Sequence, residues 1–263
     1  MARLDLTVFE RGLSKSRENA KAMIKNGCVF VNGKVCTRPS ENVSETDEIT
    51  AVSDNDYVGR GGVKLAKAIE YFGITLDGAV CVDIGASTGG FTDCMLRNGA
   101  KKVYSVDVGT GQLAEELIAN PAVVNLEKTD IRNLPKDFFA EEINFIAVDV
   151  SFISLTLILP KVAEILSDNG EAVLLIKPQF EAGRKNLNKN GVVKSPKIHR
   201  EVIDGIISFS SAMFGTAGLT YSPVARKDGN IEYLLHLRKN CDTVAVDTAK
   251  IVADAAKNVI YDK

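Results

Sequence analysis

The chain has 263 residues, 45% of them hydrophobic and 25% charged, with a formal net charge of −2. This balance is typical of a globular protein with one ordinary domain and one small one, and it excludes a disordered or fibrous chain. Apolar runs stay shorter than the ~20 residues that a membrane helix needs, and the charged N-terminal segment lacks the apolar stretch of a signal peptide. We therefore expect a cytoplasmic protein with no membrane partner.

Metal-binding residue types are sparse and scattered. The five cysteines show no Cys-x-x-Cys spacing, and the two histidines lie far apart in the sequence. This pattern predicts free thiols in a reducing compartment and no metal site.

The first 58 residues are predicted to form a small α+β unit. Ser14 is a suitable N-cap for a helix that runs to about Lys25, and Gly27 is suited to end it. Asn32 and Gly33 give the turn of a β-hairpin. The predicted strands span residues 28–31, 34–36 and 48–52.

Charge is unevenly distributed along the chain. Residues 1–38 carry eight basic and three acidic side chains, a local net charge of +5, so the remainder is acidic by 7. Such asymmetry favours an anionic partner for the N-terminal unit, although a solvated charged surface would give the same pattern.

From residue 59 to residue 240, near-continuous apolar strands alternate with helices. This order predicts a parallel sheet with helices on both faces. Only five residues separate the last two strands, so these two are expected to pair as an antiparallel hairpin. The predicted strands span 79–84, 102–107, 122–126, 144–150, 171–176, 219–225 and 231–237, and the predicted helices span 92–98, 112–118, 154–166 and 196–214. Residues 241–263 predict an amphipathic tail helix with Val252, Ala256 and Val259 on one face.

A glycine-rich turn follows the first of these strands, where nucleotide-like ligands bind in doubly wound sheets. Its spacing is G-x-x-x-G-G, which is not the dinucleotide fingerprint, and no phosphate-binding lysine follows it. A purely structural turn, needed for packing, is the competing interpretation. The candidate cofactor-binding residues in and before the turn are Asp83, Gly85, Ala86, Ser87, Gly89, Gly90 and Phe91.

Acidic residues recur at the ends of successive strands. Asp107 ends the second strand, where a carboxylate can accept hydrogen bonds from ribose hydroxyls, and Asp130 follows the third, where it can meet an adenine amino group. Asp149 follows the fourth strand. Carboxylates at the ends of successive strands, without a phosphate-binding lysine, favour S-adenosylmethionine over NAD or ATP as the cofactor.

A lysine ends the fifth strand, beside the expected cofactor site. Lys177 and Asp149 are predicted to meet at one rim of the sheet, with Glu232 on the hairpin strand and Lys64 on the helix before the sheet. Apolar surroundings and a second cation would lower the pKa of Lys177 and allow it to take a proton from a hydroxyl. A structural salt bridge between Lys177 and Asp149 explains the positions equally well.

Five segments carry a family resemblance: GRGGVKL, DIGASTGGFTD, VDVSFISL, LIKPQFE and GNIEYLLHL. In this order and spacing they resemble the TlyA-type rRNA methyltransferases. These are relatives of the FtsJ (RrmJ) ribose 2′-O-methyltransferases and are often labelled hemolysins. Residues 1–58 resemble the αL RNA-binding motif of a small-subunit ribosomal protein and of pseudouridine synthases.

The resemblance implies a Rossmann-like α/β methyltransferase domain with a seven-stranded, mostly parallel sheet over residues 59–240, after an RNA-binding domain over residues 1–58. It implies S-adenosylmethionine as the cofactor and cytidine 2′-O-methylation in ribosomal RNA as the activity. It also implies a catalytic tetrad that falls on Lys64, Asp149, Lys177 and Glu232. In that tetrad Lys177 would be the base, Lys64 and Glu232 would position the hydroxyl and tune Lys177, and Asp149 would bridge tetrad and methyl donor.

The expected partner is ribosomal RNA or a ribosomal subunit. In the N-terminal unit the candidate RNA-binding residues are Arg3, Arg11, Lys15, Arg17, Lys21 and Lys25, which can meet phosphates. Arg184, Lys185 and Lys189 in the basic loop 184–197 can extend this surface.

Other targets of methylation fit the same residues less well. Methylation of a base amino group favours an N/D-P-P-Y turn after the fourth strand, where this chain has DVSF, and carbon methylation needs a nucleophilic cysteine that no late strand end supplies. A membrane-active hemolysin and a non-catalytic RNA-binding assembly factor remain the alternative functions.

Overall fold

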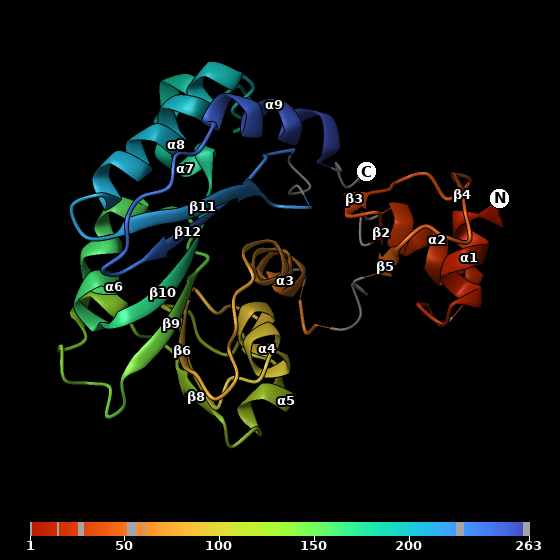
Figure 1. Ribbon diagram of the computed structural model, residues 1–263. Helices are drawn as coiled ribbons and strands as arrows, with labels where there is room; N and C mark the ends of the chain where they lie inside the picture. The colour runs from red at the N-terminus through yellow and green to blue at the C-terminus, as the bar shows by residue number, and fades with distance from the viewer. Residues whose placement is uncertain are drawn as a thin grey trace.

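The computed structural model describes residues 2–14, 16–25, 29–51, 57–59, 61–224 and 229–259. Several sequence predictions lie outside the described residues: Lys15, Gly27, the first residue of strand 28–31, the last residue of strand 48–52, the last residue of strand 219–225, and the end of the tail helix. In the ribbon diagram a small N-terminal part is followed by a larger part built around one twisted sheet (Figure 1).

The N-terminal part combines two helices with short strands around its own core. The core holds Leu4, Val8, Ala20 and Ile24, each fully buried. The helices are α1 (Leu4–Glu10) and α2 (Arg17–Lys25), and β2 (Val29–Val31), β3 (Lys34–Val35) and β5 (Ile49–Ala51) form an antiparallel sheet in the order β3-β2-β5. A second strand pair joins β1 (Ala2–Arg3) to β4 (Asn42–Val43).

This part differs from the sequence predictions in two respects. Helix α1 and the β1–β4 pair were not predicted, because α1 has only seven residues and no side-chain cap, and burial of Leu4 and Val8 stabilises it. The cap of α2 is Ser16 instead of Ser14, since Ser16 Oγ accepts a hydrogen bond from the backbone N–H of Asn19 at 3.1 Å.

A seven-stranded sheet forms the centre of the larger part, in the order β11-β12-β10-β9-β6-β7-β8. The four neighbouring pairs from β10 to β8 are parallel, whereas β12 is antiparallel to both of its neighbours. The predicted mostly parallel sheet and its terminal hairpin are therefore confirmed. The strands are β6 (Val80–Ile84), β7 (Lys102–Val106), β8 (Val123–Leu126), β9 (Ile143–Val148), β10 (Leu166–Ile176), β11 (Gly215–Tyr221) and β12 (Tyr233–Arg238).

Strand boundaries differ from prediction at several places, most in β10, β11 and β12, and β11 also ends at Tyr221 instead of residue 225. Strand β10 starts five residues earlier than predicted, with a register irregularity against β9 between Leu166 and Glu171. Strand β11 starts at Gly215, four residues early. Strand β12 starts at Tyr233, so Glu232 lies just before the strand and not within it.

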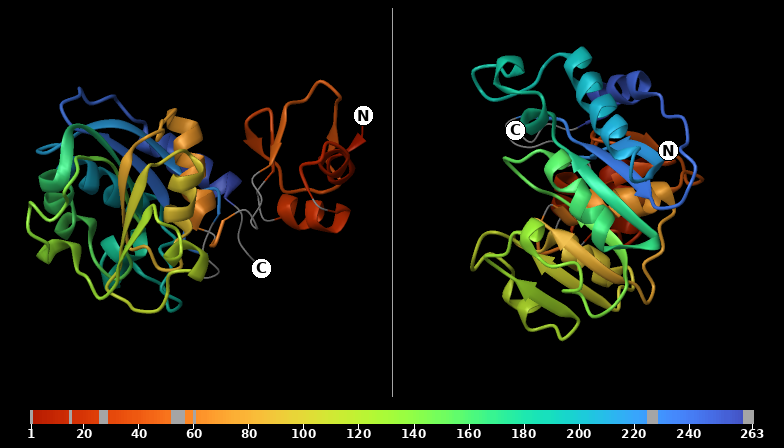
Figure 2. Two further views of the ribbon diagram at one scale, coloured as in Figure 1. Left: turned by 90° about the horizontal axis from the view of Figure 1, so that it is seen from below. Right: turned by 90° about the vertical axis from the view of Figure 1, so that its left-hand side faces the viewer.

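Helices cover both faces of this sheet (Figures 1 and 2). One core packs α3 and α4 against the sheet, and the other packs α6, α8 and α9 against the opposite face. The helices are α3 (Gly61–Phe72), α4 (Gly90–Arg97), α5 (Glu115–Ile118), α6 (Leu159–Ile165), α7 (Pro178–Glu181), α8 (Pro196–Ser210) and α9 (Thr248–Asn258), and the 3₁₀ helices are η1 (Ile131–Asn133), η2 (Leu155–Leu157) and η3 (Arg184–Asn186).

Helix boundaries also differ from prediction, since α5 starts at Glu115 instead of residue 112 and α8 ends at Ser210 instead of residue 214. The single helix expected over residues 154–166 is divided into η2 and α6, because Pro160 is tolerated only in the first turn of a helix. In α9 the buried residues are Thr248, Val252 and Ala255, and Ala256 is exposed, which corrects the predicted apolar face. Val259 is buried but follows the helix. Within the described residues, no helix combines the length and apolar character needed to cross a membrane, and no group of histidine, cysteine or acidic side chains could hold a metal ion.

Candidate active site

The turn after β6 requires glycine at its first position. Gly85 has a φ of +88°, and a Cβ atom there would lie 2.5 Å from the carbonyl oxygen of Asp149. The turn therefore runs against the end of β9, a close approach that only glycine permits. The backbone N–H of Asp149 in turn donates to the carbonyl oxygen of Ile84 at 2.9 Å, which ties the two strand ends together.

Asp107 ties the glycine turn to the next strand. Its carboxylate accepts hydrogen bonds from the backbone N–H of Ser87 and of Gly109, both at 2.7 Å. These charge-assisted contacts fix the loop after β6 and the loop after β7 around one carboxylate at the rim.

A cavity of about 520 Å³ opens at this rim. The predicted cofactor-binding residues that line it are Gly85, Ser87, Asp107, Asp130 and Asp149. Apolar side chains, among them Val106, Ile131 and Ile153, complete its wall. Asp130 is held by Arg132, whose guanidinium donates to both carboxylate oxygens, and this contact lowers the pKa of Asp130.

The other residues of the predicted cofactor motif do not line this cavity, namely Asp83, Ala86, Gly89, Gly90 and Phe91. Phe91 belongs to the core between α3, α4 and the sheet. A Cβ atom at Gly90 would lie 2.8 Å from the backbone nitrogen of Gly62, so this glycine permits α4 to approach the start of α3. Gly90 and Phe91 therefore have packing contacts of the kind that the competing interpretation of the turn describes.

Asp83 lies fully buried beneath the turn. One carboxylate oxygen accepts a hydrogen bond from Thr92 Oγ1 at 2.7 Å, and Thr92 Oγ1 also lies 2.7 Å from Ser105 Oγ. Burial raises the pKa of Asp83 to about 7. The carboxyl group therefore links β6, α4 and β7 from inside the domain.

Asp83→Asn is expected to change how stability depends on pH. Because the folded-state pKa is about 7 against an ordinary value of 3.8, this carboxyl stabilises the fold fully below pH 3.8 and loses that contribution as the pH rises through 7. An amide cannot ionise. The unfolding free energy of the variant, taken relative to that of the wild type, should therefore increase by about 3 kcal/mol from pH 5 to pH 8. Urea unfolding at both pH values measures this gain. Asp77→Asn, at an exposed position, is the control. The prediction would be contradicted if the difference in unfolding free energy between the wild type and Asp83→Asn were the same at both pH values.

Four charged residues meet at the rim beside this cavity, and we call them the ionic cluster: Lys64, Asp149, Lys177 and Glu232. Lys177 Nζ contacts Asp149 Oδ1 directly. Lys64 Nζ donates to Glu232 Oε2 at 2.5 Å and lies 3.9 Å from Asp149 Oδ2. Cations and anions thus alternate from Lys177 through Asp149 and Lys64 to Glu232.

Topology brings these four positions together. Asp149 and Lys177 follow the adjacent parallel strands β9 and β10, and Lys64 lies in the first turn of α3. Strand β12 is antiparallel to β10, so its first residues lie at the same rim as the last residues of β10. This reversal places Glu232 beside residues that lie at carboxyl ends of strands.

The ionic cluster is nearly sealed from water. The side chains of Lys177 and Glu232 are 6% and 0% exposed, against 12% for Lys64 and 18% for Asp149. Lys177 Nζ also donates to Ser151 Oγ at 3.0 Å and lies 5.9 Å from the centre of the Phe180 ring. Pro178 starts α7 immediately after Lys177, which ends the extended backbone at that residue.

An aromatic pair beside the cavity was not predicted from the sequence. Phe152 lines it, is 86% exposed and has a φ of +64°, an unfavourable conformation for a bulky residue. Its ring lies 4.8 Å from the ring of Phe180. The signal was present in the sequence as an aromatic residue three positions after Asp149, but its exposure depends on the fold.

The predicted RNA-binding cations that the structure describes are mostly engaged within the N-terminal part. Arg3 and Arg17 both pair with the buried Asp5, at 3.0 and 3.1 Å. Arg11 donates to two backbone carbonyl oxygens of the loop before β5, and Lys21 pairs with an acid of its own helix at 2.7 Å. Arg3 and Arg17 remain 45% and 43% exposed, so their free edges can still meet a partner.

Comparisons with known proteins agree with this architecture. Residues 57–239 match the FtsJ-like methyltransferase family, and residues 2–49 match the S4 domain. YqxC of Bacillus subtilis, described as a candidate rRNA methyltransferase, is 46% identical over 239 residues, covering 89% of this chain and 85% of that protein. The 16S/23S rRNA (cytidine-2′-O)-methyltransferase TlyA of Mycobacterium tuberculosis is 37% identical over 264 residues, covering 99% and 98%.

A solved structure from Streptococcus thermophilus, described as a candidate hemolysin, is 42% identical with a TM-score of 0.75, covering 98% of this chain and 96% of that one. The family matches span both parts of the chain. The chain therefore belongs to the TlyA/hemolysin A family of FtsJ-like rRNA methyltransferases, with an S4 domain at its N-terminal end.

Proposed function

We propose that this protein methylates the ribose 2′-hydroxyl of a cytidine in ribosomal RNA. The observation that carries the proposal is the nearly buried amine of Lys177, in contact with Asp149 at the edge of a cavity suited to a nucleoside. The names of its relatives support the substrate, because TlyA of Mycobacterium tuberculosis is described as a 16S/23S rRNA (cytidine-2′-O)-methyltransferase.

The cavity fits S-adenosylmethionine. Gly85 lets the turn lie against the end of β9, Asp107 and Asp130 place carboxylates at neighbouring strand ends, and apolar side chains between them suit an adenine ring. Asp149 lies where cavity and ionic cluster meet. When bound, the cofactor supplies an electrophilic methyl group.

Lys177 would accept the proton of the 2′-hydroxyl. It is the ionic-cluster amine that also contacts Ser151 and lies under the Phe180 ring, so its position is fixed from three sides. A lysine accepts a proton as a neutral amine. Asp149 would orient the amine, and the Lys64–Glu232 pair would hold Asp149 in place from the other side.

Phe152 and Phe180 would provide a surface for the target base. An exposed aromatic ring at the mouth of a nucleoside-sized cavity suits stacking on an unpaired base. The S4 domain would add phosphate contacts through the exposed edges of Arg3 and Arg17.

The decisive experiment is methyl transfer in vitro. The protein is incubated with S-adenosylmethionine carrying an isotopic methyl group and with unmodified ribosomal subunits, and the rRNA is then digested to nucleosides for mass spectrometry. We expect the label in 2′-O-methylcytidine. Label on a base would overturn the ribose assignment. Absence of both transfer and cofactor binding would favour a non-catalytic RNA-binding factor.

Asp107→Ala should weaken cofactor binding selectively. The substitution removes a carboxylate that holds two backbone N–H groups and that would accept hydrogen bonds from the cofactor ribose. We expect the dissociation constant for S-adenosylmethionine to rise between about tenfold and a hundredfold, measured by isothermal titration calorimetry. Asp137→Ala, at an exposed position outside the cavity, is the control, and equal constants for both variants would argue against the role of Asp107.

A further inference from the structure

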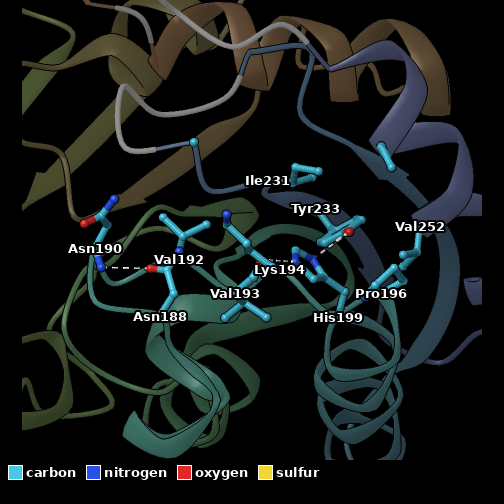
Figure 3. A pocket seen from close by; sticks show the side chains of 12 residues that line it. Asn188, Asn190, Val192, Val193, Lys194, Pro196, His199, Ile231, Tyr233 and Val252 are labelled. Carbon is cyan, nitrogen blue, oxygen red and sulfur yellow. Dashed lines mark hydrogen bonds between the residues drawn. The ribbon is translucent and has the colours of Figure 1, made fainter.

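A second cavity, of about 480 Å³, lies beside the segment that carries Glu232 of the ionic cluster (Figure 3). Its walls come from the loop before α8, the start of α8, one side of α9 and the segment that leads into β12. Val192, Ile231 and Val252 give it apolar surface, whereas Asn190 and Lys194 bring an amide and an ammonium group.

The loop that forms this cavity is held by side chains on both sides of Glu232. Asn230 Oδ1 accepts a hydrogen bond from the backbone N–H of Val193 at 3.3 Å, and Asn230 Nδ2 donates to the carbonyl oxygen of Gly191 at 3.1 Å. On the other side, Tyr233 Oη lies 2.8 Å from His199 Nδ1. The cavity is therefore built on the same short segment that carries the acid of the ionic cluster.

His199, which also links the loop before α8 to Tyr233, is a neutral side chain. Its Nε2 lies 2.8 Å from the carbonyl oxygen of Val193, which can only accept, so Nε2 carries the proton and Nδ1 accepts from the Tyr233 hydroxyl. Burial lowers the pKa of His199, in agreement with the neutral form. The hydrogen bonds of this pair are used within the protein, so a ligand would be recognised by the other lining groups.

The order of sites along the rim limits what can reach this cavity. The cofactor cavity lies at the ends of β6, β7, β8 and β9, Lys177 directly follows β10, and the second cavity begins at the residues before β12. The strand next to β10 thus leads to the second cavity, where a neighbouring unit of a chain molecule can lie when its reacting group is at Lys177.

We propose that the second cavity binds one nucleotide of the substrate RNA strand, next to the nucleotide that is methylated. This inference rests on the proposed function and adds a substrate subsite to it. The apolar walls suit the faces of an unstacked base, and the amide of Asn190 suits a base edge. Lys194 is exposed, has no acidic partner among the described residues, and suits the adjoining phosphate. Residues 184–197 carry five basic and no acidic side chains, which favours a polyanion over a neutral metabolite.

Two substitutions and one control test the subsite. Lys194→Ala removes the phosphate contact, and Val192→Trp fills the apolar space. Lys197→Ala is the matched control, because that lysine belongs to the same basic stretch but is 82% exposed, pairs with Glu201 and does not line the cavity. Thermal unfolding of each variant identifies any loss of folding. If Val192→Trp does not fold, Lys194→Ala alone tests whether the second cavity binds RNA.

We expect Lys194→Ala and Val192→Trp to raise KM for ribosomal RNA about tenfold, with kcat and the dissociation constant for S-adenosylmethionine unchanged. The slope of log affinity against log salt should fall by about 1 for Lys194→Ala and not for Val192→Trp. A KM like that of the wild type in Lys194→Ala, or an equal rise in Lys197→Ala, would overturn the subsite.

Binding of a fluorescent single-stranded oligonucleotide separates this inference from the proposed function. If the wild type transfers no methyl group to rRNA, the proposed function fails, yet anisotropy still compares oligonucleotide affinities among the same variants. Weaker binding by Lys194→Ala than by Lys197→Ala supports the subsite in that case. Equal affinities overturn it.

Discussion

Lys177→Ala should lower the rate of methyl transfer by about 10²–10⁴-fold, the range expected for loss of a general base. The dissociation constant for S-adenosylmethionine should stay within about twofold of the wild-type value, because Lys177 does not line the cofactor cavity. Single-turnover kinetics with ribosomal subunits measure the rate of the chemical step, and calorimetry measures cofactor affinity.

Lys177→Arg separates the base from a structural salt bridge, the two roles that the sequence left open. Arginine keeps a positive charge beside Asp149 but does not deprotonate in proteins. If the Lys177–Asp149 contact serves only the fold, arginine should restore much of the activity. If Lys177 is the base, both variants should be inactive although the arginine variant stays folded. An active arginine variant would refute the base assignment.

The sheet could be predicted from sequence because its strands carry their own signal. Runs such as residues 144–148 and 171–176 are almost wholly apolar, which a parallel strand buried on both faces requires. Only five residues separate the strands predicted at 219–225 and 231–237, which leaves no room for a crossover, so the hairpin followed from chain length. Short elements escaped prediction, since α1 depends on the tertiary burial of Leu4 and Val8 and has no cap of its own.

The candidate site was predictable as a set of positions but not as a set of contacts. Strand ends of a doubly wound sheet meet at one rim, and this rule alone brings Asp107, Asp149 and Lys177 together. Asp83 has the same register, yet it lies fully buried and bonded to Thr92, which no pattern in the sequence reveals. Likewise, the pairing of two N-terminal arginines with one buried carboxylate depends on how α1 and α2 pack.

Glu232→Ala is expected to have the second largest effect, on both stability and activity. The carboxylate is fully buried and accepts from Lys64 Nζ at 2.5 Å, so its removal leaves an ammonium group in a nearly dry site. Loss of one partner of a buried ion pair typically costs about 3–5 kcal/mol of unfolding free energy. Urea unfolding of Glu232→Ala and Lys64→Ala measures these losses.

The double variant Lys64→Met/Glu232→Leu distinguishes stability from chemistry. Replacing both charges by apolar side chains of similar size should recover most of the lost unfolding free energy, because no buried charge is left unpaired. Methyl transfer should nevertheless remain low, since Asp149 would lose the contact with Lys64 that balances its contact with Lys177. A stable double variant with wild-type activity would show that Lys64 and Glu232 serve the fold alone. Of the ionic cluster, only Asp149 and Lys177 would then take part in methyl transfer.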